Sequence, residues 1–126
     1  MNSLSTRKIL LVDDNPSILE MVKAELCLRA GILPENINLA SSGNSAIALI
    51  IRSGDIFDLI VSDFNMPDGN GKELLEFVIQ QNSKAYFILF TATLDIQIPT
   101  TGPNFLGVIE KHLLSALTSR ILKTFL

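Results

Sequence analysis

The residues best able to do chemistry are three aspartates that follow two apolar runs far apart in the sequence. Asp13 and Asp14 follow the run 8–12, and Asp63 follows the run 58–62. Both runs are predicted strands, and in a parallel α/β sheet the carboxyl ends of the strands border the crevice where ligands bind. Three carboxylates in one crevice would repel one another unless a divalent cation neutralised them. The pattern therefore predicts a site for a hard cation such as Mg²⁺.

Two further residues complement these aspartates. Thr91 follows the fourth predicted strand and Lys111 follows the fifth. An ammonium and a hydroxyl are the usual partners of a phosphoryl group, and a carboxylate such as that of Asp63 can act as a nucleophile and form an acyl phosphate. Each residue also has a structural interpretation, as a helix cap, a turn former or a solvated strand end. The chemical interpretation therefore depends on the whole set.

Strand-like and helix-like segments alternate along the chain, which predicts a parallel sheet covered by helices on both faces. Short apolar runs mark the strands, and apolar residues at helical spacing mark the helices. The predicted strands are 8–12, 38–40, 58–62, 86–90 and 106–110, and the predicted helices are 16–30, 45–52, 71–81 and 112–125.

The segment between Thr91 and the last predicted strand breaks this alternation. A helix is expected there, but the sequence contains Pro99, Gly102 and Pro103. An internal proline removes a helical hydrogen bond and clashes with the preceding turn, at a cost of about 3 kcal/mol. We therefore expect the fourth helix of the α/β pattern to be short, displaced or absent.

Composition and charge exclude several classes of function. The 126 residues are 48% apolar, enough for one domain with its own core, so we expect a single domain over residues 1–126 and no effector domain. The net charge of −3 supplies no basic surface for nucleic acid or membrane. The single cysteine, Cys27, excludes an internal disulfide and fits a cytoplasmic location.

In combination and in order, these motifs resemble the receiver domain of response regulators in two-component signalling. The resemblance covers residues 8–125. It implies an α/β fold of the flavodoxin-like type, with a doubly wound, five-stranded parallel sheet in the order 2-1-3-4-5. The motifs that carry it are Asp13-Asp14, the Asp-x-x-Met-Pro-x-x-x-Gly run from Asp63 to Gly71, Thr91-Ala92, and Lys111.

The resemblance also implies a role for each residue of the site. Asp63 would be the phosphoacceptor, with Mg²⁺ as the cofactor. The metal would be bound by Asp13, Asp14, Asp63 and the main-chain carbonyl of Asn65. The phosphoryl group would be held by Thr91, Lys111 and the main-chain N–H groups of Phe64 and Ala92.

The family implies protein partners and no turnover of small substrates beyond slow autodephosphorylation. A sensor histidine kinase or a phosphotransfer protein would donate the phosphoryl group. The output would be contact with a downstream protein target or formation of a homodimer, with no direct binding of nucleic acid or membrane.

Three features depart from the family pattern. His112 follows Lys111, where a proline in a cis peptide bond is common, and a cis bond without proline costs about 2.5–4 kcal/mol. The resemblance thus leaves either a strained cis bond or a rearranged loop at this point. Val108 occupies the position where an aromatic ring often turns inward, and the fourth helix is broken. We therefore expect phosphorylation without the usual coupling between the threonine and the aromatic ring.

Two other functions fit part of the pattern. A receiver-like interaction module could keep the fold and bind its partner regardless of phosphorylation, as Val108 and the broken helix would allow. An aspartyl phosphatase would need a second aspartate two residues after the nucleophile, but Asn65 stands there, which disfavours hydrolytic turnover.

Overall fold

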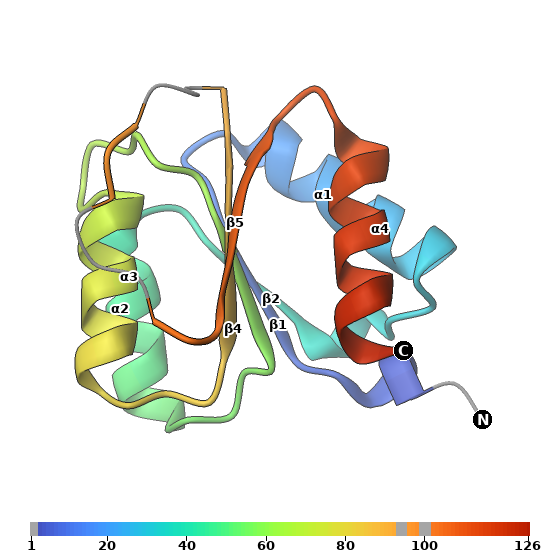
Figure 1. Cartoon of the computed structure of the whole chain (residues 1–126), viewed down its shortest axis with the longest axis horizontal. Coiled ribbons are helices and arrows are strands. Elements are labelled where there is room, and N and C mark those ends of the chain that lie inside the picture. Colours follow the sequence, from blue (N-terminus) through green and yellow to red (C-terminus); the bar gives the residue numbers. More distant parts are fainter. Residues whose placement is uncertain (1–2, 93–95, 99–101) are drawn as a thin grey trace.

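The protein forms a five-stranded parallel sheet with the strand order β2-β1-β3-β4-β5, as predicted (Figure 1). The computed structural model describes residues 3–92, 96–98 and 102–126. The strands are β1 (Ile9–Val12), β2 (Ile37–Ala40), β3 (Leu59–Ser62), β4 (Tyr86–Thr91) and β5 (Phe105–Glu110). Neighbouring strands all pair in parallel, so their carboxyl ends share one edge of the sheet.

Helices cover both faces of this sheet. The α-helices are α1 (Pro16–Arg29), α2 (Gly43–Ser53), α3 (Gly71–Gln80) and α4 (Leu114–Phe125), and the short 3₁₀ helices are η1 (Ser3–Thr6) and η2 (Pro34–Asn36). In Figure 1, α1 and α4 lie on one side of the sheet, and α2 and α3 lie on the other. Two clusters of buried apolar residues fill the two spaces between sheet and helices. Because β1 and β3 lie between these clusters, every residue of both strands is buried.

Side-chain caps fix the starts of the helices that surround the site. Asn15 accepts a hydrogen bond from the main chain of Ser17 at the start of α1. Ser42 caps α2 and Asn70 caps α3, each as part of a reciprocal capping box. The prediction that α2 starts at Ser45 was therefore two residues late. In the other direction, α4 starts at Leu114, two residues after the predicted start.

Among its described residues, the connection between β4 and β5 contains no helix, where an alternating α/β pattern would place one. Of this connection the structure describes residues 92, 96–98 and 102–104, and none of these is helical. Ile96 and Ile98 are partly buried and pack against the apolar cluster on the α2 and α3 side of the sheet. Pro99, on which part of the prediction was based, lies outside the described residues.

None of the helices in the described ranges is both long enough and apolar enough to span a bilayer.

Candidate functional site

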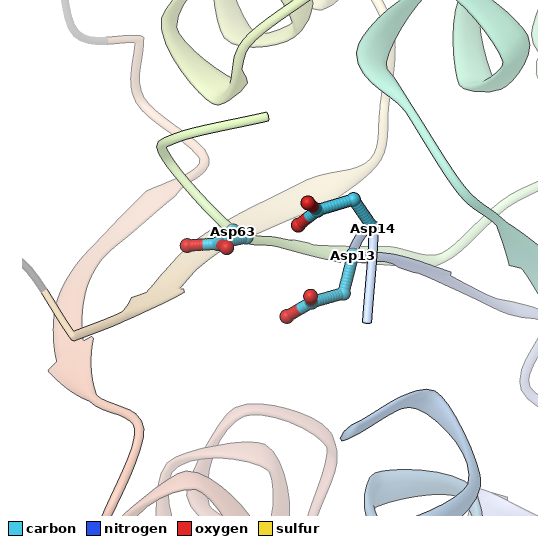
Figure 2. A group of neighbouring side chains, drawn as sticks. All are labelled: Asp13, Asp14 and Asp63. Carbon is cyan, nitrogen blue, oxygen red and sulfur yellow. The ribbon is translucent and has the colours of Figure 1, made fainter. Parts of the chain in front are cut away.

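The three predicted aspartates meet at the carboxyl edge of the sheet (Figure 2). Carboxylate oxygens of Asp13, Asp14 and Asp63 lie within 4.8 Å of one another. The sheet produces this proximity, because Val12 and Ser62 are paired in register on adjacent strands. The main-chain N–H of Asp63 also donates to the carbonyl of Val12 at 2.9 Å. Asp13 and Asp63 are buried, while Asp14 is exposed.

The donor set fits a hard cation. Mg²⁺ prefers carboxylate and carbonyl oxygens, usually from one or two carboxylates together with water. Two buried carboxylates and one exposed carboxylate supply such oxygens and leave one side of the site open to solvent. Three of the residues predicted as metal ligands, Asp13, Asp14 and Asp63, therefore form a cluster of oxygens that suits such an ion.

Lys111 lies against two of the aspartates. Its ammonium is 2.7 Å from a carboxylate oxygen of Asp13 and 2.9 Å from one of Asp63. The main-chain N–H of Lys111 donates to the carbonyl of Thr91 at 3.0 Å, which fixes the end of β5 beside β4. The peptide bond from Lys111 to His112 is trans, like every peptide bond in the described residues. A cis bond at this position is therefore not needed for the lysine to reach Asp63.

Burial and pairing shift the pKa values of this cluster. Burial raises the pKa of Asp13 above its ordinary value, and its hydrogen bond with Lys111 only partly offsets this effect. Burial alone would lower the pKa of Lys111, but its hydrogen bonds with Asp13 and Asp63 reverse this and raise the pKa. The lysine is thus held as a cation between two carboxylates.

A tight loop after β3 presents Asp63. The main-chain N–H of Phe64 donates to a carboxylate oxygen of Asp63 at 2.7 Å. The N–H of Gly71 donates to the carbonyl of Phe64 at 2.8 Å, which closes the loop. A Cβ atom on Gly71 would lie 2.3 Å from the main-chain oxygen of Asp63, so only glycine fits there. Asn65 is exposed within this loop.

The remaining predicted site residues lie at the same edge of the sheet. Thr91 ends β4, is buried, and pairs in register with Glu110. Ala92 follows it and is exposed. The structure thus brings Asp13, Asp63, Phe64 and Lys111 into direct contact, with Asp14 nearby. It places Thr91 and Ala92 at the end of the strand next to β3. The sequence did not predict that Lys111 also contacts Asp13, because no spacing rule links the two.

The fold and the site together define a class of protein with many members. Its features are a doubly wound α/β domain, with an acidic cluster and a lysine at the carboxyl edge of the sheet. The family model of the response regulator receiver domain matches residues 9–113 of this chain. The chain therefore belongs to the response regulator receiver domain family of two-component signalling.

Curated relatives are longer proteins. The response regulator protein PilR of Pseudomonas aeruginosa is 30% identical over 71% of this chain. The two-component response regulator ARR18 of Arabidopsis thaliana is 32% identical over 60% of this chain. The matched regions make up 19% and 11% of those proteins.

Solved receiver structures share the fold along nearly the whole chain. The response regulator protein TrrA of Thermotoga maritima, solved in complex with Mg²⁺ and BeF, has a TM-score of 0.78 and 26% identity, covering 96% of this chain and 100% of that one. A CheY-like receiver domain protein from Methanospirillum hungatei has a TM-score of 0.79 and 24% identity, covering 94% of this chain and 93% of that one.

Proposed function

We propose that this domain accepts a phosphoryl group on Asp63 from a phosphohistidine of a partner kinase or phosphotransfer protein, in a reaction that requires Mg²⁺. The observation that carries the proposal is the environment of the Asp63 carboxylate. One of its oxygens accepts a hydrogen bond from the N–H of Phe64, and the other accepts one from the ammonium of Lys111. Asp13 and Asp14 lie beside it.

In the transfer step, a carboxylate oxygen of Asp63 attacks the phosphorus atom. An O–P bond forms, the P–N bond to the donor imidazole breaks, and its electron pair stays on the imidazole nitrogen. The ammonium of Lys111 offsets the negative charge that accumulates near Asp63. Thr91 and the N–H groups of Phe64 and Ala92 would donate to the oxygens of the phosphoryl group.

Asp13, Asp14, Asp63 and the carbonyl of Asn65 would hold the metal. Bound Mg²⁺ would neutralise charge on the phosphoryl oxygens and orient them for in-line transfer. The protein itself mostly positions the reacting groups, which suits a domain whose substrate arrives on another protein.

The partner proteins follow from this chemistry. The donor would be a sensor histidine kinase or a phosphotransfer protein in the cytoplasm, and the phosphorylated domain would signal through a protein target or a second copy of itself. The resemblance and the family membership support these partners.

The test is intact-mass measurement after incubation with Mg²⁺ and acetyl phosphate. We expect a gain of one phosphoryl group that requires the metal and disappears in Asp63→Asn. The matched control is Asp55→Asn, because Asp55 is an exposed aspartate before β3, at the opposite end of the strand from Asp63. Equal labelling of wild type and Asp63→Asn would place the acceptor elsewhere and overturn the proposal.

A second function, partner binding without phosphorylation, has two observations in its favour. Val108 of β5 is 36% exposed and carries no ring, and the described part of the β4–β5 connection forms no helix. The same mass measurement separates the two functions. No labelling of the wild-type protein, under conditions that label another receiver, would favour the module that acts without phosphorylation.

A further inference from the structure

The loop between β3 and α3 is fastened to the start of α2 through Asp68. Both carboxylate oxygens of Asp68 accept hydrogen bonds, one from the Ser42 hydroxyl at 3.1 Å and one from the Asn44 amide at 2.9 Å. Hydrogen bonds to an ionised carboxylate are stronger than those between neutral groups. By residue type alone, Asp68 fits a helix cap or a turn equally well.

The hydroxyl of Ser42 has a single proton and two acceptors within reach, the Asp68 carboxylate at 3.1 Å and the Ser45 hydroxyl oxygen at 3.0 Å. The ionised carboxylate is the stronger acceptor of the two. Ser45 donates its own hydroxyl proton to the carbonyl of Ser42 at 3.1 Å. Its main-chain N–H donates to the Ser42 hydroxyl at 3.0 Å. The Ser42 hydroxyl is then an acceptor toward α2 and a donor toward the loop. The capping residue of α2 therefore also ties down the loop after β3.

Main-chain contacts reinforce this connection. The N–H of Gly43 donates to the carbonyl of Gly69 at 2.8 Å, and the N–H of Asn44 donates to the carbonyl of Asp68 at 3.0 Å. These are the first N–H groups of α2, which have no partner within the helix. A Cβ atom on Gly43 would lie 2.5 Å from the oxygen of Gly69. The negative charge of Asp68 also lies at the positive end of the helix.

The same loop carries the carbonyl of Asn65. At one end the loop is closed by the bond from Gly71 to Phe64. At its turn it is held on α2 by Asp68. Between these two fastenings, Met66 is buried in the apolar cluster on the α2 and α3 side. The Asn65 carbonyl therefore lies in a loop that is held on both sides of it, and Asp68 makes its contacts with α2 three residues further along the chain.

We propose that Asp68 is a positioning residue that tightens Mg²⁺ binding by fixing the Asn65 carbonyl, without touching the ion. This inference rests on the proposed function, because it assumes that the acidic cluster binds the metal. Loss of a residue that orients a metal ligand typically lowers metal affinity by about 10–100-fold. We expect Asp68→Ala to raise the Kd for Mg²⁺ about tenfold.

The experiment is calorimetric titration of the metal-free protein with Mg²⁺, together with urea unfolding. The matched control is Asp55→Ala, because Asp55 likewise accepts from a hydroxyl, that of Ser83 at 2.6 Å, and from a main-chain N–H, that of Lys84 at 3.1 Å. Both variants lose two hydrogen bonds that hold a loop, but only Asp68→Ala should change the Kd for Mg²⁺. A tenfold loss in both would assign the effect to general destabilisation and overturn the proposal.

A third variant separates position from charge. Asn44→Ala removes one hydrogen bond to Asp68 and leaves the carboxylate in place, so positioning predicts a smaller loss of Mg²⁺ affinity in the same direction. If Asn44→Ala binds Mg²⁺ like wild type while Asp68→Ala does not, long-range charge explains the effect and the proposal fails.

The two failures are distinguishable. A wild-type protein that binds no Mg²⁺ refutes the proposed function. If wild type binds Mg²⁺ and Asp68→Ala binds it with the same Kd, only the role of Asp68 is refuted. Hydrogen exchange at residues 65–71 supplies a readout without metal, since faster exchange is expected in Asp68→Ala and not in Asp55→Ala.

Discussion

Two connections leave the same edge of the sheet, and they are built in opposite ways. The loop from Asp63 to Asn70 is closed on itself by Gly71 and fastened to α2 by Asp68. The connection from β4 to β5 has no helix among residues 92, 96–98 and 102–104. It covers the sheet with partly buried side chains, including Ile96 and Ile98.

The strand before the first connection, β3, and the strand after the second, β5, show the same contrast. Every residue of β3 is buried, whereas only Ile109 of β5 is. The pairing of β5 with β4 also shifts register between Phe87 and Ile88. The chain thus packs tightly around the strand that carries Asp63, and more loosely around the strand that follows the β4–β5 connection.

The largest effect on this comparison should come from Gly71→Ala, which breaks the tight loop. The added methyl would lie 2.3 Å from the oxygen of Asp63 and 3.0 Å from the Cα of Phe64. Both are main-chain atoms and cannot move aside singly. We expect the free energy of unfolding to fall by about 3 kcal/mol, measured by urea unfolding, and phosphorylation of Asp63 to slow.

The control is Gly54→Ala, at a glycine with φ of +82° and no atom within 4 Å of an added Cβ. Backbone strain should cost it about 1–3 kcal/mol, yet its phosphorylation rate should equal that of wild type. If both variants slow phosphorylation equally, global stability, and not the Asp63 loop, controls the reaction.

The second effect comes from Lys111→Met, which keeps the length of the side chain and removes its charge. Because the ammonium touches both Asp13 and Asp63, it offsets charge in the transfer and also competes with a bound cation. We expect the phosphorylation rate to fall about tenfold, or about 1.4 kcal/mol in the barrier, while the affinity for Mg²⁺ does not fall. Mass spectrometry measures the phosphorylation rate, and calorimetry measures the affinity for Mg²⁺.

Lys84→Met is the matched control, since Lys84 is an exposed lysine before β4, at the opposite end of the sheet. It changes the net charge equally and should leave both quantities unchanged. A parallel loss of Mg²⁺ affinity in Lys111→Met would mean that the lysine organises the carboxylates more than it competes with the metal.

The alternation of strands and helices predicted the sheet because burial on both faces requires apolar runs, as in β1 and β3. The error at the start of α2 came from a cap. The helix α2 starts two residues earlier than predicted because the Ser42 hydroxyl accepts a hydrogen bond from the main-chain N–H of Ser45. The spacing of apolar residues does not reveal this bond.

The site was predictable where strand order brings residues together, as for Asp13 and Asp63. The site was not predictable where it depends on contacts between two elements whose relative position no sequence pattern determines. Asp68 accepts hydrogen bonds from Ser42 and Asn44, which lie 26 and 24 residues away in the sequence. By residue type alone, Asp68 could equally be a simple turn residue with no such contacts. Only the folded chain shows that the turn is fastened to a helix.

The smallest effect should come from Val108→Ala in β5, and the neighbouring Ile109→Ala provides the scale. Val108 is 36% exposed and Ile109 is 7% exposed, on the same strand. Truncating Ile109 leaves a cavity and should cost about 2–5 kcal/mol of unfolding free energy. Truncating Val108 removes a half-solvated group and should cost at most about 1 kcal/mol.

Urea unfolding of both variants measures this difference. A loss in Val108→Ala that approaches that of Ile109→Ala would show that the β4–β5 connection covers this face of β5 as firmly as a helix would. The contrast between the two connections would then fail. A small loss would instead mean that a ring at position 108 would have little to pack against, so a conformational response to the proposed phosphorylation would have to use other residues.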